Sequence, residues 1–378
     1  MSARSVTARI ILFCFLLFSG IGTMPRLIAQ EAPENKIPAT PAQDDSGAPV
    51  DVKVRRLLSK YESEVSFLLP EGEFDATLDK KIGYFSTLAR ARYNFVRGEM
   101  GFSLQNTYTR FRVVPQTAVY DRLLFVPVFE ANRNDRVWRR EQGVQLGARL
   151  FLFSPVNALT GFNYQRYSFP STVNQQKLSS QQVHSISQAI GVQADSARFL
   201  GFYNSGTLDL AVVRAFPYGS NHAQFWQLQL STRGMAETSW LAIIGEAKLI
   251  SMLDEGEGVP LSFLGGRNRL SAYDTNEFSG VNLFYLSEST RLHLNKDKAV
   301  ALAGGFSLLE TNLILHTEVG QIGLNDQVRD LSSYHVSLGA GFNSILAYRQ
   351  RRACEFFFYT YKALEPRRNL RYYFGVKF

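Results

Sequence analysis

Segments in which apolar and polar residues alternate recur along most of the chain, and they constrain its fold more than any other feature. The last of them reads NLRYYFGVKF, residues 369–378, and its apolar parity holds Leu370, Tyr372, Phe374, Val376 and Phe378. Successive side chains of a strand point to opposite faces of the sheet. This pattern therefore predicts a strand with one apolar face and one polar face.

About fifteen such segments follow one another. They lie near 62–74, 85–95, 99–114, 119–134, 144–152, 155–170, 182–197, 206–219, 226–233, 238–252, 281–295, 310–325, 334–343, 354–364 and 369–378. Many run to roughly 10–16 residues, longer than the ~5–6 residues usual in soluble sheets. That length suits a tilted strand that crosses ~30 Å of hydrocarbon. Bacterial single-chain barrels have even strand numbers, so we predict sixteen strands, with fourteen as the alternative.

Closure of the sheet explains how such strands could stand in lipid. Every backbone N–H and C=O there must be paired within the protein, so a membrane sheet has to close on itself. We therefore predict an all-β fold, a transmembrane antiparallel β-barrel over 55–378, in the bacterial outer membrane. Its closing strand would present Tyr372, Phe374 and Phe378 on the apolar face. An exported soluble β-sandwich also alternates, but it explains neither the strand length nor the terminal aromatic residue.

The amino-terminal region predicts export. A basic start, MSARSVTAR, precedes the apolar run IILFCFLLFSGIG and the small-residue site LIA before Gln30, which predicts a signal peptide over 1–29. Residues 30–54 hold four prolines and few bulky apolar residues. Such a segment buries too little surface to offset its ordering entropy, so we predict a disordered linker.

Composition narrows the possible functions. The formal charge is +8, but no cluster of five to eight Lys and Arg residues occurs, so nucleic acid is not an expected partner. Cys354 is the one cysteine outside the predicted signal peptide, and no metal-ligand set or cofactor motif is present. Ser220 and His222 stand close together without a third catalytic member. We expect no enzyme activity and keep a barrel lipid hydrolase as the remote alternative.

Residues 264–280, LGGRNRLSAYDTNEFSG, form the segment with the most distinctive composition. The segment lies between two alternating segments and contains Gly265, Gly266, Arg267, Arg269 and Tyr273. An ordinary surface loop is also rich in glycine and charge. However, this order of residues, followed later by LHTEVGQIG at 315–323, resembles the BamA/TamA superfamily of outer-membrane insertases and transporters over about 238–378.

The resemblance implies a loop that folds into the barrel, of the form L-G-G-x-x-x-[LV]-R-G-[YF]. Its arginine would meet an acidic wall residue in a pattern like F-x-D-x-G. In this chain Glu318 and Gly320 fit the wall pattern, but Ser271 and Ala272 stand where the family has arginine and glycine. A guanidinium–carboxylate pair is geometrically demanding, and serine cannot supply it. We therefore predict that Arg269 or Arg267 pairs with Glu318; the alternative is that this chain has lost the inward lock.

The resemblance also implies a function. The chain would insert or translocate polypeptides, or act as a plugged channel derived from such a barrel, without the family's polypeptide-transport-associated repeats. A passive pore or structural surface barrel is the alternative. Expected partners are outer-membrane lipid, the barrel-assembly machinery during insertion and a polypeptide client. Glu288 shares the apolar parity of its segment, so it either faces lipid or is moved inward by a bulge.

Overall fold

The computed structural model describes residues 63–378 apart from short gaps. The gaps are 70–71, 83, 111, 128–135, 154–155, 169–182, 196–204, 217–222, 255–261, 267–268, 275, 296–298, 324–333, 350 and 366–367. The predicted signal peptide and linker lie outside the described residues. Within the described residues, no helix has the length and apolar composition that a membrane span requires.

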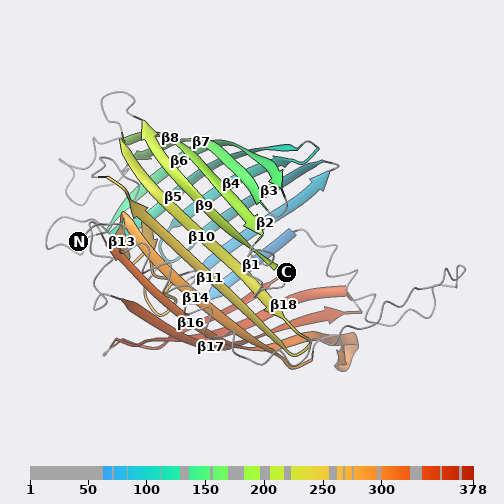
Figure 1. Ribbon diagram of the computed structural model, residues 1–378. Coiled ribbons are helices and arrows are strands. Elements are labelled where there is room, and N and C mark those ends of the chain that lie inside the picture. Colours follow the sequence, from blue (N-terminus) through green and yellow to red (C-terminus); the bar gives the residue numbers. More distant parts are fainter. Residues whose placement is uncertain are drawn as a thin grey trace, which may run out of the picture. The chain divides into compact units, whose positions relative to one another are not determined.

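Among the described residues, sixteen antiparallel strands pair in a ring that forms the wall of a barrel. Figure 1 shows how these strands curve around the barrel. They are β1 (Ser63–Leu69), β2 (Glu73–Ile82), β3 (Phe85–Asn94), β4 (Glu99–Tyr108), β5 (Val113–Pro127), β6 (Arg136–Phe153), β7 (Val156–Ser168), β8 (Val183–Asp195), β9 (Ser205–Phe216), β10 (Phe225–Glu237), β11 (Leu241–Met252), β14 (Asn282–His293), β16 (Phe306–Gly323), β17 (His335–Tyr348), β18 (Arg351–Ala363) and β19 (Arg371–Lys377). The predicted all-β barrel and its sixteen wall strands are confirmed.

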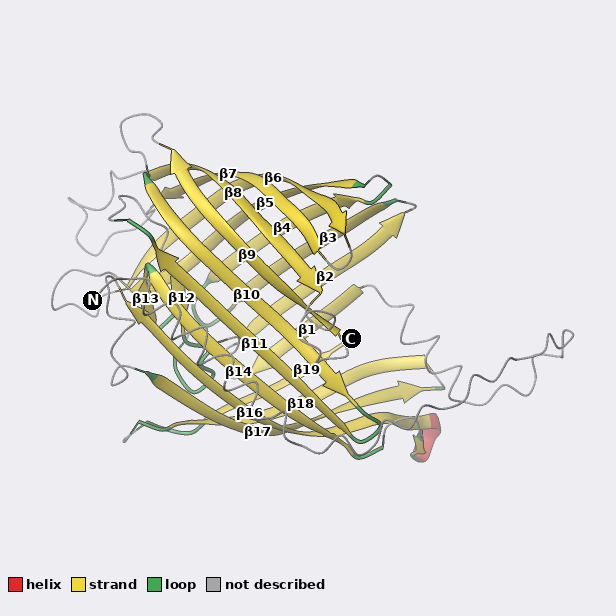
Figure 2. Cartoon of the chain, viewed as in Figure 1, coloured by secondary structure: helices red, strands yellow, loops and turns green. Residues whose placement is uncertain are grey.

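Three short strands stand outside the wall count. β15 (Val300–Ala301) pairs with β16 only, after the connection that leaves β14, and a single 3₁₀ turn follows at Ala303–Gly305. β12 (Ser262–Leu264) and β13 (Phe278–Gly280) pair with each other as a separate two-stranded sheet. Figure 2 shows this small sheet among the labelled wall strands. It forms the base of the connection between β11 and β14.

The barrel closes where β1 meets β19. Residues 66–69 of β1 stand opposite 374–377 of β19, and Val65 and Phe378 exchange two backbone hydrogen bonds of 3.2 and 2.8 Å. We call this pairing the seam. It is short compared with the β5–β6 pairing, which runs in register from Val113 to Pro127. Each of the sixteen described wall strands thus pairs with a neighbour on both sides, which meets the backbone requirement of a membrane wall.

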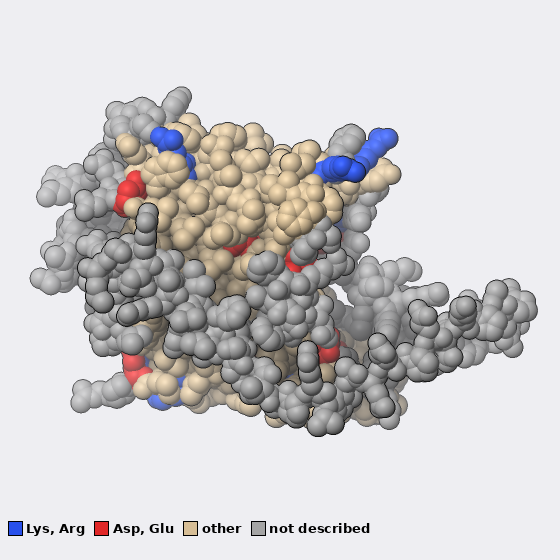
Figure 3. Space-filling model, in the orientation of Figure 1, with Lys and Arg blue, Asp and Glu red and all other residues tan. Residues whose placement is uncertain are grey.

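The outer face is apolar. Large hydrophobic side chains on one parity of the wall strands are exposed, among them Phe67, Leu146, Phe162, Ile190, Leu315, Phe342 and Phe374. Figure 3 shows one face on which most described atoms belong to uncharged residues, with Lys, Arg, Asp and Glu visible at few places. An apolar skin around a polar lumen is the arrangement of an outer-membrane β-barrel.

One sequence expectation needs revision, and one open alternative is decided. The segment near 62–74 was expected as one strand, but it covers β1 and the turn into β2, so β2 is the missing sixteenth strand. Its second half, LDKKI, carries charges on both parities and hides the alternation. Glu288 is exposed, and the β14–β16 register runs without a bulge from Asn282 to His293. Its carboxylate therefore lies on the outer face.

The strand order separates the connections into two ends. The connections from β5 to β6, β7 to β8, β9 to β10, β11 to β14 and β16 to β17 leave from one end, which we call the long-loop end. Most connections at the opposite end are tight, such as those from β2 to β3 and from β17 to β18. Outer-membrane barrels place their longer loops outside the cell, so the long-loop end faces outward from the cell.

Candidate functional site

The connection between β11 and β14 folds back into the lumen over 264–280, and we call this segment the lumen loop. Leu264, Leu270 and Tyr273 are completely buried, in one cluster with inward-facing side chains of β14, β18 and β19. The loop therefore rests on the inner wall, as the sequence comparison predicted. Burial of three large side chains makes it an element with its own core and not a solvated connection.

Glycines permit the loop's close approach to itself and to the wall. Gly265 has φ +109°, and a Cβ atom there would lie 2.1 Å from the carbonyl oxygen of Asp274. Gly320, on β16, faces the loop, where a Cβ atom would lie 3.0 Å from Leu264 and 3.1 Å from Leu270. The predicted glycines thus act on both sides of one contact: Gly265 tightens the loop, and Gly320 makes room for its leucines.

Glu318 is the buried anchor of the loop on the wall, with only 1% of its side chain exposed. The backbone N–H of Ser271 donates to its Oε2 at 2.5 Å, and the Tyr285 hydroxyl donates to its Oε1 at 2.9 Å. His316 Nε2 lies 3.4 Å from the same Oε1. A buried carboxylate needs such donors to offset its lost hydration. Glu318 therefore holds the loop through a backbone amide.

The expected arginine partner is not what the structure places at Glu318. Arg269 lies in the lumen cavity described below, and among the described residues its side chain forms no ion pair with Glu318. Arg267 lies outside the described residues. The physical reason is the loop's turn at Leu270, whose φ of +57° directs the Ser271 N–H to the wall. A backbone donor occupies the place predicted for a guanidinium.

The loop is also tied to the closing strand. The Tyr373 hydroxyl donates to the Ser271 carbonyl at 2.8 Å, and Arg371 forms an ion pair with Asp274. Tyr373 and Arg371 lie on the inward parity of β19, opposite to Tyr372, Phe374 and Phe378, which are exposed on the outer face. The side chains of β19 therefore alternate in what they contact: those on the outer face point to the lipid, and those on the inner face contact the loop.

A second set of contacts holds the tip of the loop. The Tyr273 hydroxyl lies 3.3 Å from the Val336 carbonyl and 3.1 Å from Glu365 Oε1, while Arg368 stacks over the Tyr273 ring at 5.1 Å. His335 Nδ1 lies 2.5 Å from the same Glu365 oxygen. Burial raises the pKa of the Glu365 carboxyl, but His335, Tyr273 and Arg368 outweigh it and hold that pKa below its ordinary value.

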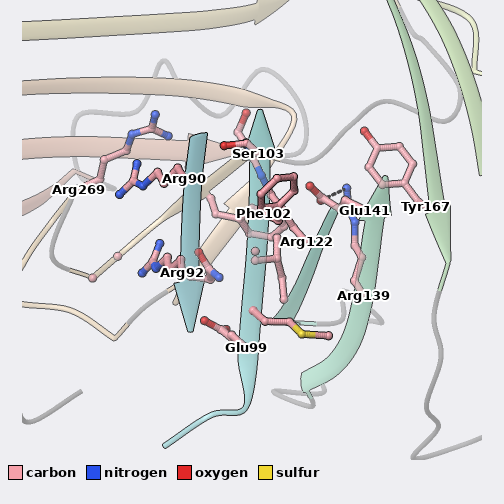
Figure 4. A pocket seen from close by; sticks show the side chains of 18 of the residues that line it. Arg90, Arg92, Glu99, Phe102, Ser103, Arg122, Arg139, Glu141, Tyr167 and Arg269 are labelled. Carbon is pink, nitrogen blue, oxygen red and sulfur yellow. Dashed lines mark ion pairs between the residues drawn. The ribbon is translucent and has the colours of Figure 1, made fainter. Parts of the chain in front are cut away.

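A polar cavity of about 560 Å³ lies beside the loop inside the barrel (Figure 4). Inward side chains of β3 to β7 and Lys248 of β11 line one part, and Gly265, Gly266 and Arg269 of the loop line another. Six cations and two carboxylates face it: Arg90, Arg92, Arg122, Arg139, Lys248, Arg269, Glu99 and Glu141. The lining therefore carries a formal charge of +4.

Part of this charge is balanced locally. Arg139 Nη2 lies 2.7 Å from Glu141 Oε1, the pair marked in Figure 4, and its guanidinium stacks over Tyr167 at 4.1 Å. Arg90 pairs with Asp75, and Arg92 pairs with Glu73. The other three cations of the lining are Arg122 of β5, Lys248 of β11 and Arg269 of the loop. Anions that enter the lumen therefore meet a positive field.

Sequence reasoning missed several residues that hold the loop: Asp274, Tyr285, Ser337, Glu365, Arg368, Arg371 and Tyr373. Ser337 belongs here because its Oγ accepts the Ala272 N–H at 3.1 Å. The polar parity of the last segment contained a usable signal, since a tyrosine among inward-facing residues of a wall strand needs a hydrogen-bond partner. Ser220 and His222 lie outside the described residues.

Solved structures with the same fold include three barrels. CdiB from Escherichia coli has a TM-score of 0.58 at 16% identity, over 84% of this chain and 63% of that chain. BamA from Haemophilus ducreyi, lacking POTRA domains 1–3, gives 0.52 at 12% identity, over 84% and 69%. CdiB from Acinetobacter baumannii gives 0.54 at 11% identity, over 83% and 58%. The chain therefore has the sixteen-stranded barrel fold of CdiB and BamA.

The similarity to these solved structures is limited in chain coverage and in sequence identity. The chain spans less than two thirds of the length of either CdiB. No family model matches the sequence, and no curated protein matches it. At identities of 11–16%, these matches show that the fold is shared and show nothing about function. The BamA-type barrel predicted from the sequence is confirmed at the level of fold.

Proposed function

We propose that this outer-membrane barrel inserts or translocates polypeptides, and that the lumen loop closes it in the resting state. Release of the loop from Glu318 and from β19 opens the lumen and frees the seam. The barrel fold shared with CdiB and BamA supports the transport class. The anchoring of one loop to both β16 and β19 supports the gating role.

The loop contacts carry the proposal. One loop residue, Ser271, contacts both β16 and β19. Its N–H donates to Glu318 of β16, and its carbonyl accepts from Tyr373 of β19. The seam beside β19 is short, so few ladder hydrogen bonds resist its separation. A loop that braces β19 from inside therefore stabilises closure, and its departure lowers the free energy needed to part β1 from β19.

Planar-bilayer conductance tests the gate. A variant with residues 266–276 replaced by a short Gly-Ser linker should conduct several-fold more than the wild-type barrel, because the loop no longer fills the lumen. Equal conductance of the two proteins contradicts the plug and favours a passive pore. A matched linker in the connection from β16 to β17 controls for shortening a loop at the same end.

Client handling is tested separately. Photo-crosslinkers at Phe67 and Val376, which face each other across the seam, should capture an unfolded outer-membrane polypeptide added to the reconstituted barrel. The same probes at Phe162 and Gln188, a paired site far from the seam, should capture none. Equal capture at both sites overturns the insertase part and leaves the gated channel standing.

A further inference from the structure

A row of polar side chains crosses the outer face near the long-loop end. Asp121, Gln142, Arg166 and His184 are direct neighbours on β5, β6, β7 and β8. They share their parity with the exposed side chains of Val119, Val144 and Tyr164, so they face the surroundings of the barrel. Charged groups on a lipid-facing surface are costly at the membrane centre and tolerated near its interfaces.

Most polar side chains of this row find hydrogen-bond or ion-pair partners within the protein. Arg140 pairs with Asp121, with Nη2 to Oδ2 at 2.5 Å and Nε to Oδ1 at 3.0 Å, and Gln142 donates to the same carboxylate at 3.1 Å. His184 Nδ1 lies 2.9 Å from the Tyr164 hydroxyl. Among the described residues, these four contacts leave Arg166 as a cation of the row without an ion pair.

Arg166 has an unmet hydrogen-bonding demand. Its Nε is buried and has no hydrogen-bond partner, and within the described part of the chain the side chain forms no ion pair. It is the third residue from the end of β7, next to the connection that leads into the long-loop end. The Nε lies beneath protein atoms, so an anion from outside the barrel would contact the two terminal nitrogens of the guanidinium.

A second cation lies further around the same rim. Arg214 of β9 stands opposite Gln188 and Trp226 on the outward parity. Its guanidinium stacks over Trp226 at 4.8 Å and over Phe216 at 5.0 Å, and Trp226 is 40% exposed. Two rings hold the planar group in place without neutralising its charge. Arg214 is thus a positioned cation in the aromatic girdle of the barrel.

The spacing of the two arginines constrains the ligand. They are two strands apart, and their partners on β8, His184 and Gln188, are four residues apart. With ~4.8 Å between strands and ~3.3 Å rise per residue, their Cα atoms lie roughly 16 Å apart. A single phosphate cannot contact both main chains at that distance, whereas a headgroup with two separated phosphates can meet both side chains.

We propose that Arg166 and Arg214 form a binding site for a lipid headgroup that carries two phosphates, the phosphorylated glycolipid of the outer leaflet. Each guanidinium forks onto one phosphate through charge-assisted hydrogen bonds. Phe216, Trp226 and the apolar face below them contact the acyl chains. The long-loop end places the site in the leaflet where this lipid resides. The site is independent of the lumen and of transport.

Native mass spectrometry of the full-length barrel tests the site. Nanodiscs of phosphatidylcholine contain either diphosphorylated lipid A, monophosphorylated lipid A or phosphatidylglycerol. The wild-type barrel should retain the diphosphorylated lipid, and Arg166→Gln or Arg214→Gln should reduce its retention about tenfold. The matched control is Arg110→Gln, because Arg110 stacks over Tyr84 at 5.7 Å in a turn at the opposite end.

The outcomes separate the sources of phosphate. Equal retention of phosphatidylglycerol and diphosphorylated lipid A overturns the two-phosphate site, and retention that survives both arginine changes overturns the proposal entirely. Heat-modifiable migration confirms that each variant is folded. Arg214→Lys keeps the positive charge but cannot donate two parallel hydrogen bonds to one phosphate. It should therefore retain more lipid than Arg214→Gln and less than wild type. Trp226 fluorescence should respond to the diphosphorylated lipid in wild type and not in Arg214→Gln.

Discussion

The backbone N–H of Ser271 donates to Glu318 Oε2 at 2.5 Å, across 47 positions of sequence. The sequence resemblance led us to expect a guanidinium at this carboxylate, and the structure supplies a peptide group. A backbone donor requires a specific loop conformation but no specific side chain. The anchor can therefore persist although serine and alanine stand at 271 and 272.

Removal of the Glu318 charge should weaken the loop anchor. In Glu318→Gln the Ser271 N–H and the Tyr285 hydroxyl lose a charged acceptor, so we expect a loss of about 1–3 kcal/mol in stability and a higher open probability. Urea unfolding in detergent and bilayer recordings measure the two effects. Glu288→Gln, on the outer face of β14, is the control and should leave the open probability unchanged.

A side chain at Gly320 should displace the loop. Gly320→Val places methyl groups where a Cβ atom already comes within 3.1 Å of Leu264 and Leu270, so overpacking should cost about 1–3 kcal/mol. Faster proteolysis within 264–280 would report the displacement. Gly101→Val is the matched control, because a Cβ atom there meets only Arg122 at an ordinary 3.6 Å. Similar proteolysis of both variants would contradict the contact.

Acid should loosen the tip of the loop through Glu365. The pKa of its carboxyl is held below the ordinary value, so its stabilising contribution is present above about pH 4 and is lost as pH falls through that lowered pKa. Tyr273, His335 and Arg368 face this group. Channel opening in wild type should rise between pH 5 and pH 3. Glu365→Gln should open more at pH 5 and show a smaller rise; an unchanged rise would exclude Glu365 as the titrating group.

The seam should depend on backbone pairing at Phe378. Phe378→Pro removes the N–H that donates to the Val65 carbonyl at 2.8 Å, and we expect a loss of about 1 kcal/mol or more. Heat-modifiable gel migration should shift to a lower transition temperature. Phe378→Ala keeps the N–H and loses the ring, so it separates the ladder from lipid contact. Because proline loses the ring as well as the N–H, equal shifts for the two variants would show that the ring dominates.

The alternating pattern determined the fold class and the outward face of β19, because a strand's two faces follow directly from residue parity. The number sixteen came from about fifteen segments together with the even strand count of bacterial barrels. The pattern failed at β2, whose charges at Asp79, Lys80 and Lys81 stand near a strand end. Composition marked 264–280 as a distinct segment, and the family resemblance pointed to Glu318 as its wall residue. Parity and composition are local properties, so they reach the strands and the segment but not its partner on the wall.

Only the tertiary structure decided which atoms meet in the lumen. The partner of Glu318, the bracing of β19 by Tyr373 and the outward placement of Glu288 depend on strand register and on the backbone turn at Leu270. The same holds for Arg166 and Arg214, which are 48 positions apart and come to one rim through two strand pairings. Strand register and the fold of the loop set these distances, and a linear pattern of residues does not specify register.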